Sequence, residues 1–376
     1  MIKNKCNYKI LYITPDIDSG GAENILFNIV KSKNIEEVII ISLTDIGFYG
    51  MRLINQGYKV YALNMQKNFL LVFKFIYLVI LIKKFRPKYI HTWLYHANLI
   101  GGIAGKIARV KRIYWSIHHD YEYSNFMMMI EMKILTILSY LIPNKIIYCS
   151  KMVQKNHIKN GYKKSISQTI ENGISTSQFK PNKKYRKELR NQFNIGNDCL
   201  LLGNVSRYHP IKDHENLFKA LSLLNKEKIN FKCILVGRGL INTNKELLKK
   251  IKKFNLSDKV ILYGKSFEIY KIMAGLDLHI LSSKKEAFGM VLLEAMSTGI
   301  PCLSTDVGEA KNIIGNTGWI VNVSDPSALA FKISKIVNEK INLETFSSLR
   351  RDRILRKYSL EKMIKSYSEI YKEINL

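Results

Sequence analysis

The sequence predicts an α/β protein made of two doubly wound parallel-sheet domains that face a central cleft. The chain of 376 residues is longer than one ordinary domain. Strand-like apolar runs alternate with helical patterns from end to end, which is typical of βαβ units. This pattern restarts after the polar stretch Phe179–Lys184, which holds the only proline between Pro143 and Pro210. Ligands of such sheets bind beyond the carboxyl ends of the strands, so we expect the functional residues at the cleft.

The first half of the chain carries six runs rich in β-branched and aromatic residues, and each predicts a strand. A helical segment follows the first of them at Ala22–Lys31, where Ile25, Ile29 and Val30 share one face. The predicted strands are Tyr8–Thr14, Val38–Leu43, Lys59–Leu63, Tyr89–Thr92, Ile113–Ile117 and Lys145–Cys149.

Two longer apolar stretches, Phe69–Ile82 and Asn125–Ile142, also lie in the first half. The first is shorter than the ~20 residues that cross a bilayer, and Glu131 and Lys133 interrupt the second. We therefore expect buried helices of the core and no transmembrane segment. The alternative is that one flank of a stretch lies on a membrane surface.

The second half predicts a second sheet and a terminal helix. We expect an amino-terminal domain over residues 1–178, a carboxyl-terminal domain over 179–357 and a helix over 358–376. In that helix Met363, Tyr367 and Tyr371 recur at i, i+4 spacing, which indicates one packed face. The predicted strands of the second sheet are Cys199–Ser206, Phe231–Gly237, Val260–Gly264, Leu276–Ser282 and Ile300–Thr305.

The chain is strongly basic, with 59 basic and 30 acidic residues and a net charge of +29. Residues 1–180 hold 25 basic and 10 acidic residues, an excess of +15, and the remaining residues carry an excess of +14. The basic charge is thus spread evenly along the chain and does not form the localised basic patch that is typical of nucleic-acid binding. A solvated basic surface and an electrostatic preference for anionic membrane or diphosphate substrates both remain open. Five scattered cysteines fit a reducing cytosol and predict neither a disulfide framework nor a zinc site.

The strongest functional signal is the stretch EAFGMVLLEAMSTGIPCLSTDVGEA, which begins at Glu286. Glu286 lies on a loop and Glu294 inside the helix that follows, so both carboxylates can face one ligand along its length. A carboxylate accepts two hydrogen bonds from vicinal hydroxyls, which suits a ribose for Glu294 and a hexose for Glu286. The backbone amides of Phe288, Gly289 and Met290 at the helix start suit an anion or sugar oxygens. The alternative is that Glu286 is only a first-turn charge favoured by the helix dipole and that Glu294 is only an exposed residue of the helix.

A second signal is GNVSRYHPIKDHENLFKAL, which reads as a strand, a loop and a helix. Arg207 and Lys212 lie in that loop, five residues apart, at the carboxyl end of the strand. A guanidinium and an ammonium that converge there could neutralise a diphosphate. The alternative is two ordinary surface cations.

The opening stretch SGGAEN follows the first predicted strand and lacks the G-x-G-x-x-G dinucleotide pattern. By itself it predicts a tight turn with Ser19 as the helix N-cap. Beside a phosphate-binding second domain, Gly21 would let a nucleotide-linked sugar approach without an intervening side chain. Asp16 and Asp18 form a D-x-D, for which we favour a solvent or capping role over a metal site.

Four histidines lie in or just after predicted strands of the first sheet, in HTWLYHANLIGG and WSIHHD. His118 is the strongest candidate for a polar contact with the reacting sugar. His91, His96 and His119 are acceptor-side candidates. No third ligand at metal-binding spacing accompanies them, so we expect no metal.

Together these residues resemble one family, the retaining GT-B glycosyltransferases of family 4. The resemblance covers nearly the whole chain, and the E-x7-E block is its specific part. It implies that Arg207 and Lys212 hold the donor diphosphate, Glu294 the ribose, and Glu286 with the 288–290 backbone the donor sugar. It also implies that Gly21 lies beside the phosphates and that the terminal helix crosses back to the first domain. The family pattern usually reads Lys-Gly where this chain has Lys212 and Asp213.

The resemblance implies a metal-independent transfer of a hexose or N-acetylhexosamine, with retention and without a cofactor. The donor expected is a UDP-sugar, and the acceptor is a polyprenyl-diphosphate-linked glycan of capsule or O-antigen synthesis. Such an enzyme would be cytoplasmic, with peripheral contact at the inner face of the membrane and no nucleic-acid partner. Two alternatives stay open: a nucleotide-sugar epimerase of the same fold, and a basic nucleic-acid-binding protein.

Overall fold

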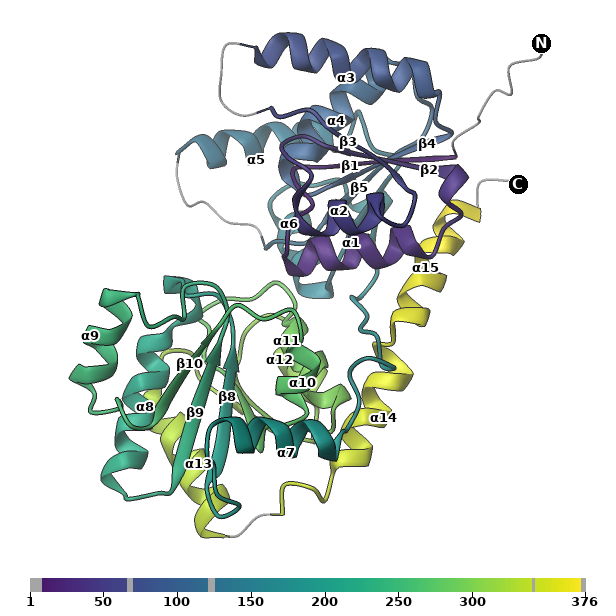
Figure 1. Ribbon diagram of the computed structural model, residues 1–376. Coiled ribbons are helices and arrows are strands. Elements are labelled where there is room, and N and C mark those ends of the chain that lie inside the picture. The colour runs from purple at the N-terminus through teal and green to yellow at the C-terminus, as the bar shows by residue number, and fades with distance from the viewer. Residues whose placement is uncertain (1–8, 66–69, 121–125, 340–341, 373–376) are drawn as a thin grey trace. The chain divides into compact units, whose positions relative to one another are not determined.

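The computed structural model describes residues 9–65, 70–120, 126–339 and 342–372, and it divides into two compact units (Figure 1). Unit 1 comprises Met1–Asn172 and Met363–Leu376, and unit 2 comprises Gly173–Lys362. The chain therefore leaves unit 1 at Asn172 and returns to it with its last helix.

Unit 1 is built on a seven-stranded parallel sheet with the order β3-β2-β1-β4-β5-β6-β7. Its strands are β1 (Ile10–Thr14), β2 (Val38–Ser42), β3 (Lys59–Ala62), β4 (Tyr89–Trp93), β5 (Ile113–Ile117), β6 (Lys145–Tyr148) and β7 (Ser167–Thr169). Its helices are α1 (Gly21–Lys31), α2 (Gly47–Ile54), α3 (Leu71–Phe85), α4 (Tyr95–Ile107), α5 (Phe126–Leu138), α6 (Lys151–Lys159) and, from Met363 on, α15 (Leu360–Lys372). Helices α1 and α2 lie on one side of the sheet, and α3 and α4 lie on the other (Figure 1).

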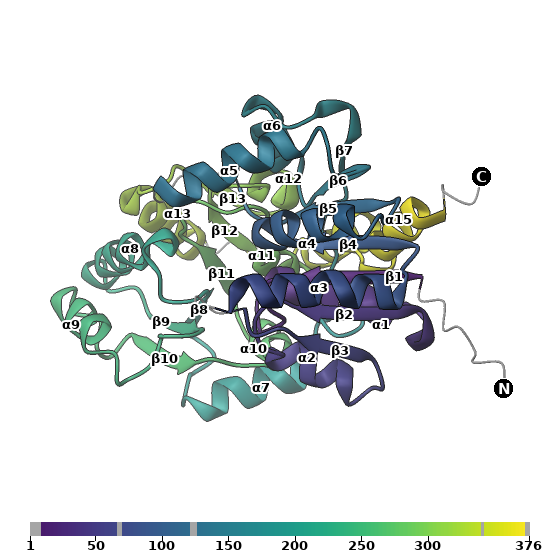
Figure 2. The same ribbon diagram turned by 90° about the horizontal axis from the view of Figure 1, so that it is seen from above.

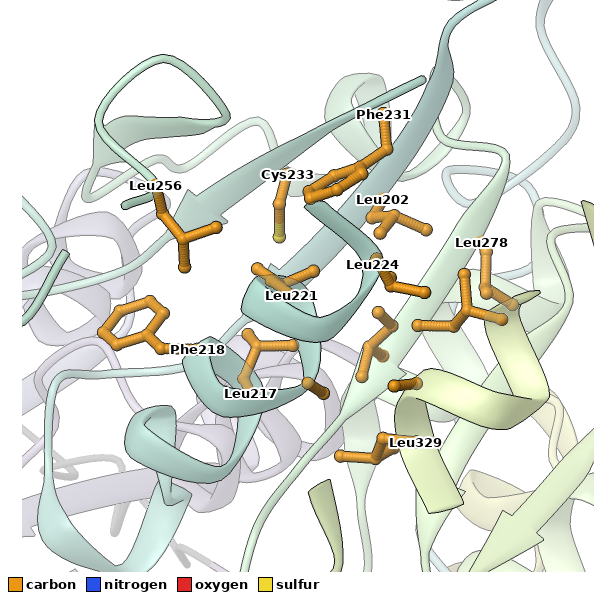
Figure 3. Close-up of a cluster of buried hydrophobic side chains, with 14 of the residues drawn as sticks. Leu202, Leu217, Phe218, Leu221, Leu224, Phe231, Cys233, Leu256, Leu278 and Leu329 are labelled. Carbon is orange, nitrogen blue, oxygen red and sulfur yellow. The ribbon is translucent and has the colours of Figure 1, made fainter. Parts of the chain in front are cut away.

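Unit 2 repeats this architecture with six parallel strands in the order β10-β9-β8-β11-β12-β13. Its strands are β8 (Leu200–Val205), β9 (Phe231–Val236), β10 (Val260–Gly264), β11 (Leu278–Leu281), β12 (Cys302–Thr305) and β13 (Trp319–Val321). Its helices are α7 (Lys183–Gln192), α8 (His214–Lys226), α9 (Lys245–Lys253), α10 (Ile269–Met273), α11 (Met290–Ser297), α12 (Ala310–Ile314), α13 (Pro326–Asn338) and α14 (Ser347–Lys357). Side chains of α8 pack on β8, β9 and β11 in one core cluster, which Leu329 of α13 joins (Figure 3).

The structure confirms the predicted strands and adds two that the sequence did not indicate. Residue Tyr8 of the first predicted strand lies outside the described residues. The additional strands, β7 and β13, are three residues long and only partly buried. Edge strands this short lack the apolar alternation that reveals a strand, so their pairing with β6 and β12 decides their conformation.

The expectation that the two long apolar stretches form buried helices is wrong. Helix α3 buries Leu78, Val79, Leu81 and Ile82 but exposes most of its other apolar side chains. Helix α5 buries only Met132 and Leu135 among its described residues. Each helix covers the sheet with one face only, and the apolar residues continue round to the outer face. In the described ranges no helix is both long enough and apolar enough to cross a bilayer.

The last helix is held in unit 1 by polar contacts as well as by its apolar face. The hydroxyl of Tyr371 lies 3.2 Å from that of Tyr12 and 2.5 Å from Nδ1 of His91. Lys33 donates a hydrogen bond to Ser368 at 2.8 Å. Met363, Tyr367 and Tyr371 are all buried, as their spacing predicts. Residues 373–376 of the predicted helix lie outside the described residues.

Unit 2 contains a buried arginine without a carboxylate partner among the described residues. Arg350 on α14 is 2% exposed and donates to the carbonyls of Thr317, Gly299 and Leu343 at 2.9–3.0 Å. These carbonyls follow three different elements, so one side chain ties them together. We expect Arg350→Ala to lower the free energy of unfolding by about 3–5 kcal/mol, because two buried carbonyls and the partly buried carbonyl of Leu343 lose their donor. Chemical denaturation measures this loss.

The control is Arg356→Ala, since Arg356 lies on the same helix and is exposed. Its effect should stay within about 0.5 kcal/mol. A loss below about 1 kcal/mol for Arg350→Ala would show that water or neighbouring groups replace the guanidinium, and would contradict this role.

Candidate functional site

In unit 2 the predicted residues gather at the carboxyl ends of the central strands. The strand order reverses between β8 and β11, and ligands of doubly wound sheets bind at such a switch point. Arg207 follows β8, and Ser282 and Ser283 follow β11. Gly308 and Glu309 follow the next strand, β12. This edge therefore concentrates the polar groups that the motifs predicted.

Lys212 and Glu286, 74 positions apart in the sequence, form an ion pair in which Nζ and Oε1 are 2.6 Å apart. Their side chains are 19% and 13% exposed, so the pair is largely shielded from water. Ser283 donates a second hydrogen bond to the same carboxylate oxygen at 2.7 Å. The structure thus brings the cation of one motif to the carboxylate of the other, within reach of a ligand at the strand ends.

The loop that presents Lys212 is held by its neighbours. Ser282 donates to the carbonyl of Lys212 at 3.1 Å. Asp213, where the family pattern has glycine, adopts the left-handed conformation with φ 49°. Aspartate tolerates this region, and here it gains a role that glycine lacks, because its carboxylate accepts from the amide of Asn216 and caps α8. The departure from the family pattern keeps the turn intact.

Gly308 and Ser283 support Glu286, and the sequence analysis assigned a role to neither. Gly308 has φ +55°, and a Cβ there would come within 2.7 Å of the carbonyl oxygen of Glu286. A side chain would therefore displace the Glu286 loop. The signal available in the sequence is DVGE, which directly follows the strand β12. Glycine is needed at this position because the backbone of Glu286 approaches it closely, and not because the loop must be flexible.

Glu294 is half-buried on α11, and no hydrogen bond or ion pair joins its carboxylate to another described residue. Loss of water around the carboxylate raises its pKa to about 7. A desolvated carboxylate without a partner is unfavourable for stability. Such a group is typical of a ligand site, where a bound hydroxyl pair would supply the missing donors.

The segment before α11 contributes backbone rather than side chains. The Phe288 ring is buried and packs edge-on against Tyr358, with centroids 6.1 Å apart. Gly289 is the N-cap with φ +99°, a conformation that favours glycine. The side chain of Phe288 is therefore structural. The amides at 288–290 are those of a helix start, where an anion or sugar oxygen is favoured.

Arg207 is exposed, and its guanidinium makes no hydrogen bond or ion pair with the described residues. The bend behind it requires glycine: at Gly237, with φ +150°, a Cβ would lie 1.9 Å from the carbonyl oxygen of Ser206. Arg207 is thus placed at the strand end by a fixed backbone while its side chain is left for a ligand.

In unit 1 Gly20 and Gly21 follow β1 and open α1, at the point where that sheet also reverses its strand order. The helix begins at Gly21, with Gly20 as an N-cap in extended conformation and no side-chain capping bond. The interpretation of Ser19 as N-cap is therefore wrong. Gly21 is exposed at the first turn. Asp16 accepts from the amide of Asp18 at 3.2 Å, which closes a turn within the loop, and neither carboxylate caps α1.

His118 is the buried histidine of this edge whose ring nitrogens lack hydrogen-bond partners among the described residues. Burial, with smaller effects from His119 and His91, lowers its pKa to about 3, so the ring is neutral at physiological pH. The Trp93 indole stacks on it with centroids 4.4 Å apart. Trp93 also donates to the carbonyl of Ala22 at 3.1 Å and so links His118 to the start of α1. No motif in the sequence marks Trp93 as a site residue.

The three other histidines have different surroundings. His91 is buried, with its ring nitrogens 2.5 Å from the Tyr371 hydroxyl and 2.8 Å from that of Ser116. It holds the last helix in place and is not available to an acceptor, so we withdraw it as a candidate. His96 is exposed and pairs with Glu131 at 2.6 Å, which raises its pKa. His119 is exposed at the end of β5.

Neither unit contains a metal cluster within the described ranges, where no three His, Cys, Asp or Glu side chains are placed to hold an ion. The cations at the unit 2 edge include Arg207 and Lys212, which follow β8, and Lys284, which follows β11 and lies 3.7 Å from the carboxylate of Asp213.

Comparison with known proteins covers both units. The family model described as Glycosyltransferase Family 4 matches residues 19–178, and the one described as Glycosyl transferases group 1 matches residues 185–353. The N-acetyl-alpha-D-glucosaminyl L-malate synthase of Bacillus anthracis is 28% identical over 189 residues, which are 50% of this chain and 49% of that protein. The capsular polysaccharide biosynthesis glycosyltransferase CapM of Staphylococcus aureus is 24% identical over 78% of this chain and 79% of its own length. The matches cover 49%, 35% and 52% of the lengths of the first three curated relatives.

Solved structures share the fold across the whole chain. The crystal structure of HepE from Anabaena in complex with UDP-glucose superposes with a TM-score of 0.87. The two proteins are 23% identical, and the match covers 97% of this chain and 100% of the other.

Proposed function

We propose, because the chain belongs to family 4 of the GT-B glycosyltransferases, that it transfers a hexose or N-acetylhexosamine from a nucleotide sugar with retention of configuration. The observation that carries the proposal is the arrangement at the switch point of unit 2. There a Lys212–Glu286 pair and an unpartnered Glu294 lie on segments that follow neighbouring strands. Cation and carboxylates together match the phosphates and hydroxyls of one donor molecule.

In this proposal Lys212 and Arg207 bind the diphosphate of the donor. Lys212 would exchange its contact with Glu286 for a phosphate oxygen, and the freed carboxylate would accept from hydroxyls of the sugar. Glu294 accepts from the two ribose hydroxyls, and the amides at 288–290 bind further sugar oxygens. Gly21 of unit 1 leaves room for the phosphates. The contacts made by Lys212, Arg207 and the two carboxylates are charge-assisted hydrogen bonds of about 1.5–3 kcal/mol each.

The chemical step needs no side chain as a base. The bond between the anomeric carbon and the diphosphate oxygen breaks, and its electron pair stays on the diphosphate. The acceptor oxygen attacks the anomeric carbon from the same face, and its proton passes to the departing phosphate. Fixed positive charge from Lys212 and Arg207 stabilises the leaving group. His118, neutral at physiological pH, can contact a hydroxyl of the reacting sugar without adding charge.

For the donor we propose a UDP-sugar, because the structurally similar HepE was solved with UDP-glucose. For the acceptor we propose a polyprenyl-diphosphate-linked glycan at the inner face of the cell membrane. The named relatives in capsule and O-antigen biosynthesis support this class of acceptor. The reaction as proposed requires no metal and no cofactor.

The test is thermal stabilisation of the full chain by UDP, GDP, ADP and their sugars in the presence of EDTA. At 100 times its dissociation constant a ligand should add about 2.7 kcal/mol to stability. We expect selective stabilisation by uridine nucleotides and its loss in Arg207→Ala. No response to any nucleotide sugar would contradict the proposal.

A second readout separates the alternatives. Incubation with the stabilising donor and no acceptor should leave the sugar unchanged apart from slow hydrolysis. Conversion to an isomeric nucleotide sugar without acceptor would establish an epimerase instead. Tight, salt-sensitive binding of DNA or RNA without any nucleotide-sugar response would point to the nucleic-acid alternative.

A further inference from the structure

Acidic residues are absent from one long segment of unit 1. Residues 46–119 contain no Asp or Glu, although the two halves of the chain carry similar net charge. This acid-free segment includes α3 and α4. Its basic residues are Arg52, Lys59, Lys67, Lys74, Lys83, Lys84, Arg86, Lys88, Lys106, Arg109, Lys111 and Arg112.

Helix α3 carries a row of large apolar side chains on its outer face. Val72, Phe73 and Ile80 are 66%, 63% and 53% exposed, and Ile76 and Tyr77 are about half exposed. These positions are spaced by three, four and seven residues, so they share one face. The same face ends in Lys83 and Lys84 at the last turn. An exposed apolar row that ends in cations is typical of a helix that lies in a membrane interface.

Helices α3, α4 and α5 lie side by side in one layer, and each outer helix contacts α4 (Figure 2). Helix α5 also exposes apolar side chains, with Phe126 at 69%, Met127 at 73% and Ile137 at 65%. Between them α4 contributes half-buried apolar residues, among them Ile100 and Ile103. The apolar surface therefore extends over three helices, far beyond the scattered exposed residues of an ordinary protein surface.

A basic pocket of about 620 Å³ lies where α3 and α4 end. Lys83, Arg86 and Arg109 close the helix ends, where cations are favoured by the helix dipole. The dipole does not explain the remaining cations, which lie beyond the helices before β4 and β5. The basic residues that line the pocket are Lys83, Arg86, Lys88, Arg109, Lys111 and Arg112.

We propose that the outer face of the α3–α4–α5 layer docks unit 1 onto an anionic lipid bilayer, with the basic pocket holding the phosphate of an acidic phospholipid headgroup. The apolar side chains of α3 and α5 enter the interfacial region, and the cations face the headgroups. The pocket lies at the amino-terminal edge of the sheet, opposite the edge that carries His118. Docking thus leaves the predicted site of unit 1 uncovered, and it does not depend on the transfer reaction.

Charge and apolarity together favour a bilayer over other partners. A nucleic acid would match the cations but not the broad apolar face. A protein partner would need acidic groups opposite the pocket and an apolar counterpart several helices wide. An anionic bilayer supplies phosphates and hydrocarbon in the same surface.

The test is co-sedimentation of the full chain with vesicles of phosphatidylcholine alone or with 30% phosphatidylglycerol. We expect at least tenfold tighter binding to the anionic vesicles. The double variant Phe73→Ser, Ile80→Ser should weaken that binding at least tenfold, because it removes two inserted side chains. Phe331→Ser is the matched control, since Phe331 is 65% exposed on α13 of unit 2.

The pocket is tested separately with Lys83→Glu, Lys111→Glu and the control Lys245→Glu, Lys249→Glu on α9. We expect only the first pair to lose the preference for phosphatidylglycerol. All replaced side chains are exposed, and a melting curve checks that each variant folds. Binding unchanged by both the apolar and the charge variants would overturn the proposal. Equal loss with the α9 control would show a general charge effect and would also overturn it.

Discussion

Replacing Lys212 by alanine should lower the turnover number for sugar transfer by about 10²–10³-fold, which is the usual loss when one fixed group that stabilises transition-state charge is removed. The donor diphosphate gains negative charge as the glycosidic bond breaks, and the Lys212 ammonium is held at the strand ends to meet it. Steady-state kinetics with the donor found by thermal stabilisation measures the effect. The loss should appear in kcat and in kcat/KM.

The control is Lys249→Ala, because Lys249 is exposed on α9 and no described residue pairs with it. Its kinetics should equal those of the unmodified protein. Lys212→Ala also breaks the ion pair with Glu286, so a loss of activity could come from a loss of stability. The experiment must therefore measure both. If Lys212→Ala lowers the melting temperature while kcat is unchanged, the pair serves stability, and the role in leaving-group stabilisation is wrong.

Replacing Glu294 by glutamine should abolish tight donor binding and yet stabilise the folded protein at pH 8. The pKa of Glu294 is about 7 in the folded chain against an ordinary value of 4.5, so the folded state favours the protonated form. Ionisation therefore destabilises the fold above pH 7. The penalty shrinks as the pH falls from 7 to 4.5 and is absent below that range.

We expect Glu294→Gln to gain about 1–3 kcal/mol of unfolding free energy at pH 8 and nothing at pH 4, measured by urea denaturation. The control is Glu215→Gln on α8, where the hydrogen bond from Lys219 lowers the pKa of the carboxyl. That substitution should not stabilise the protein at pH 8. A stability loss in Glu294→Gln would show that an unseen partner satisfies the carboxylate.

The same carboxylate should make donor affinity dependent on pH. Only the ionised form accepts from both ribose hydroxyls, so affinity should fall about tenfold per pH unit below 7. Calorimetric titration of the nucleotide from pH 5.5 to 8 measures this slope. Glu294→Gln should bind weakly at every pH and lose the slope near pH 7. A wild-type affinity that is constant over this range would contradict the assignment of Glu294 to the ribose.

Local pattern was sufficient for most of the secondary structure and for the chemistry-bearing residues of unit 2. Period-two and continuous apolar runs mark strands that are buried by helices, and the polar residues after them follow strand ends by chain order. The positions of Arg207, Lys212, Glu286 and Glu294 after the ends of β8 and β11 were therefore predictable without coordinates. Asp213 fits a turn at which the resembled family usually has glycine, because aspartate tolerates the positive φ of 49° found here.

Tertiary structure decided which residues meet, because strand order is a long-range property. Only the order β10-β9-β8-β11-β12-β13 brings the Lys212 loop beside Ser283 and Glu286. His91 is a second example. Its position at the end of a predicted strand suggested a site residue, but its ring is hydrogen-bonded to the hydroxyl of Tyr371 on the last helix. The partners of such residues come from distant segments, which no local pattern records.

What the sequence alone determined is thus the alternation of strands and helices, the terminal helix face and the residue types at the strand ends. What only the tertiary structure decided is the pairing of Lys212 with Glu286, the place of Gly308 and the outer face of α3. The reason is physical. Hydrophobic periodicity shows which residues of a segment could be buried, whereas the surfaces that pack against the segment decide which of them are buried. Helix α3 has apolar residues on all sides and only one sheet face to cover, so its outer side chains stay exposed.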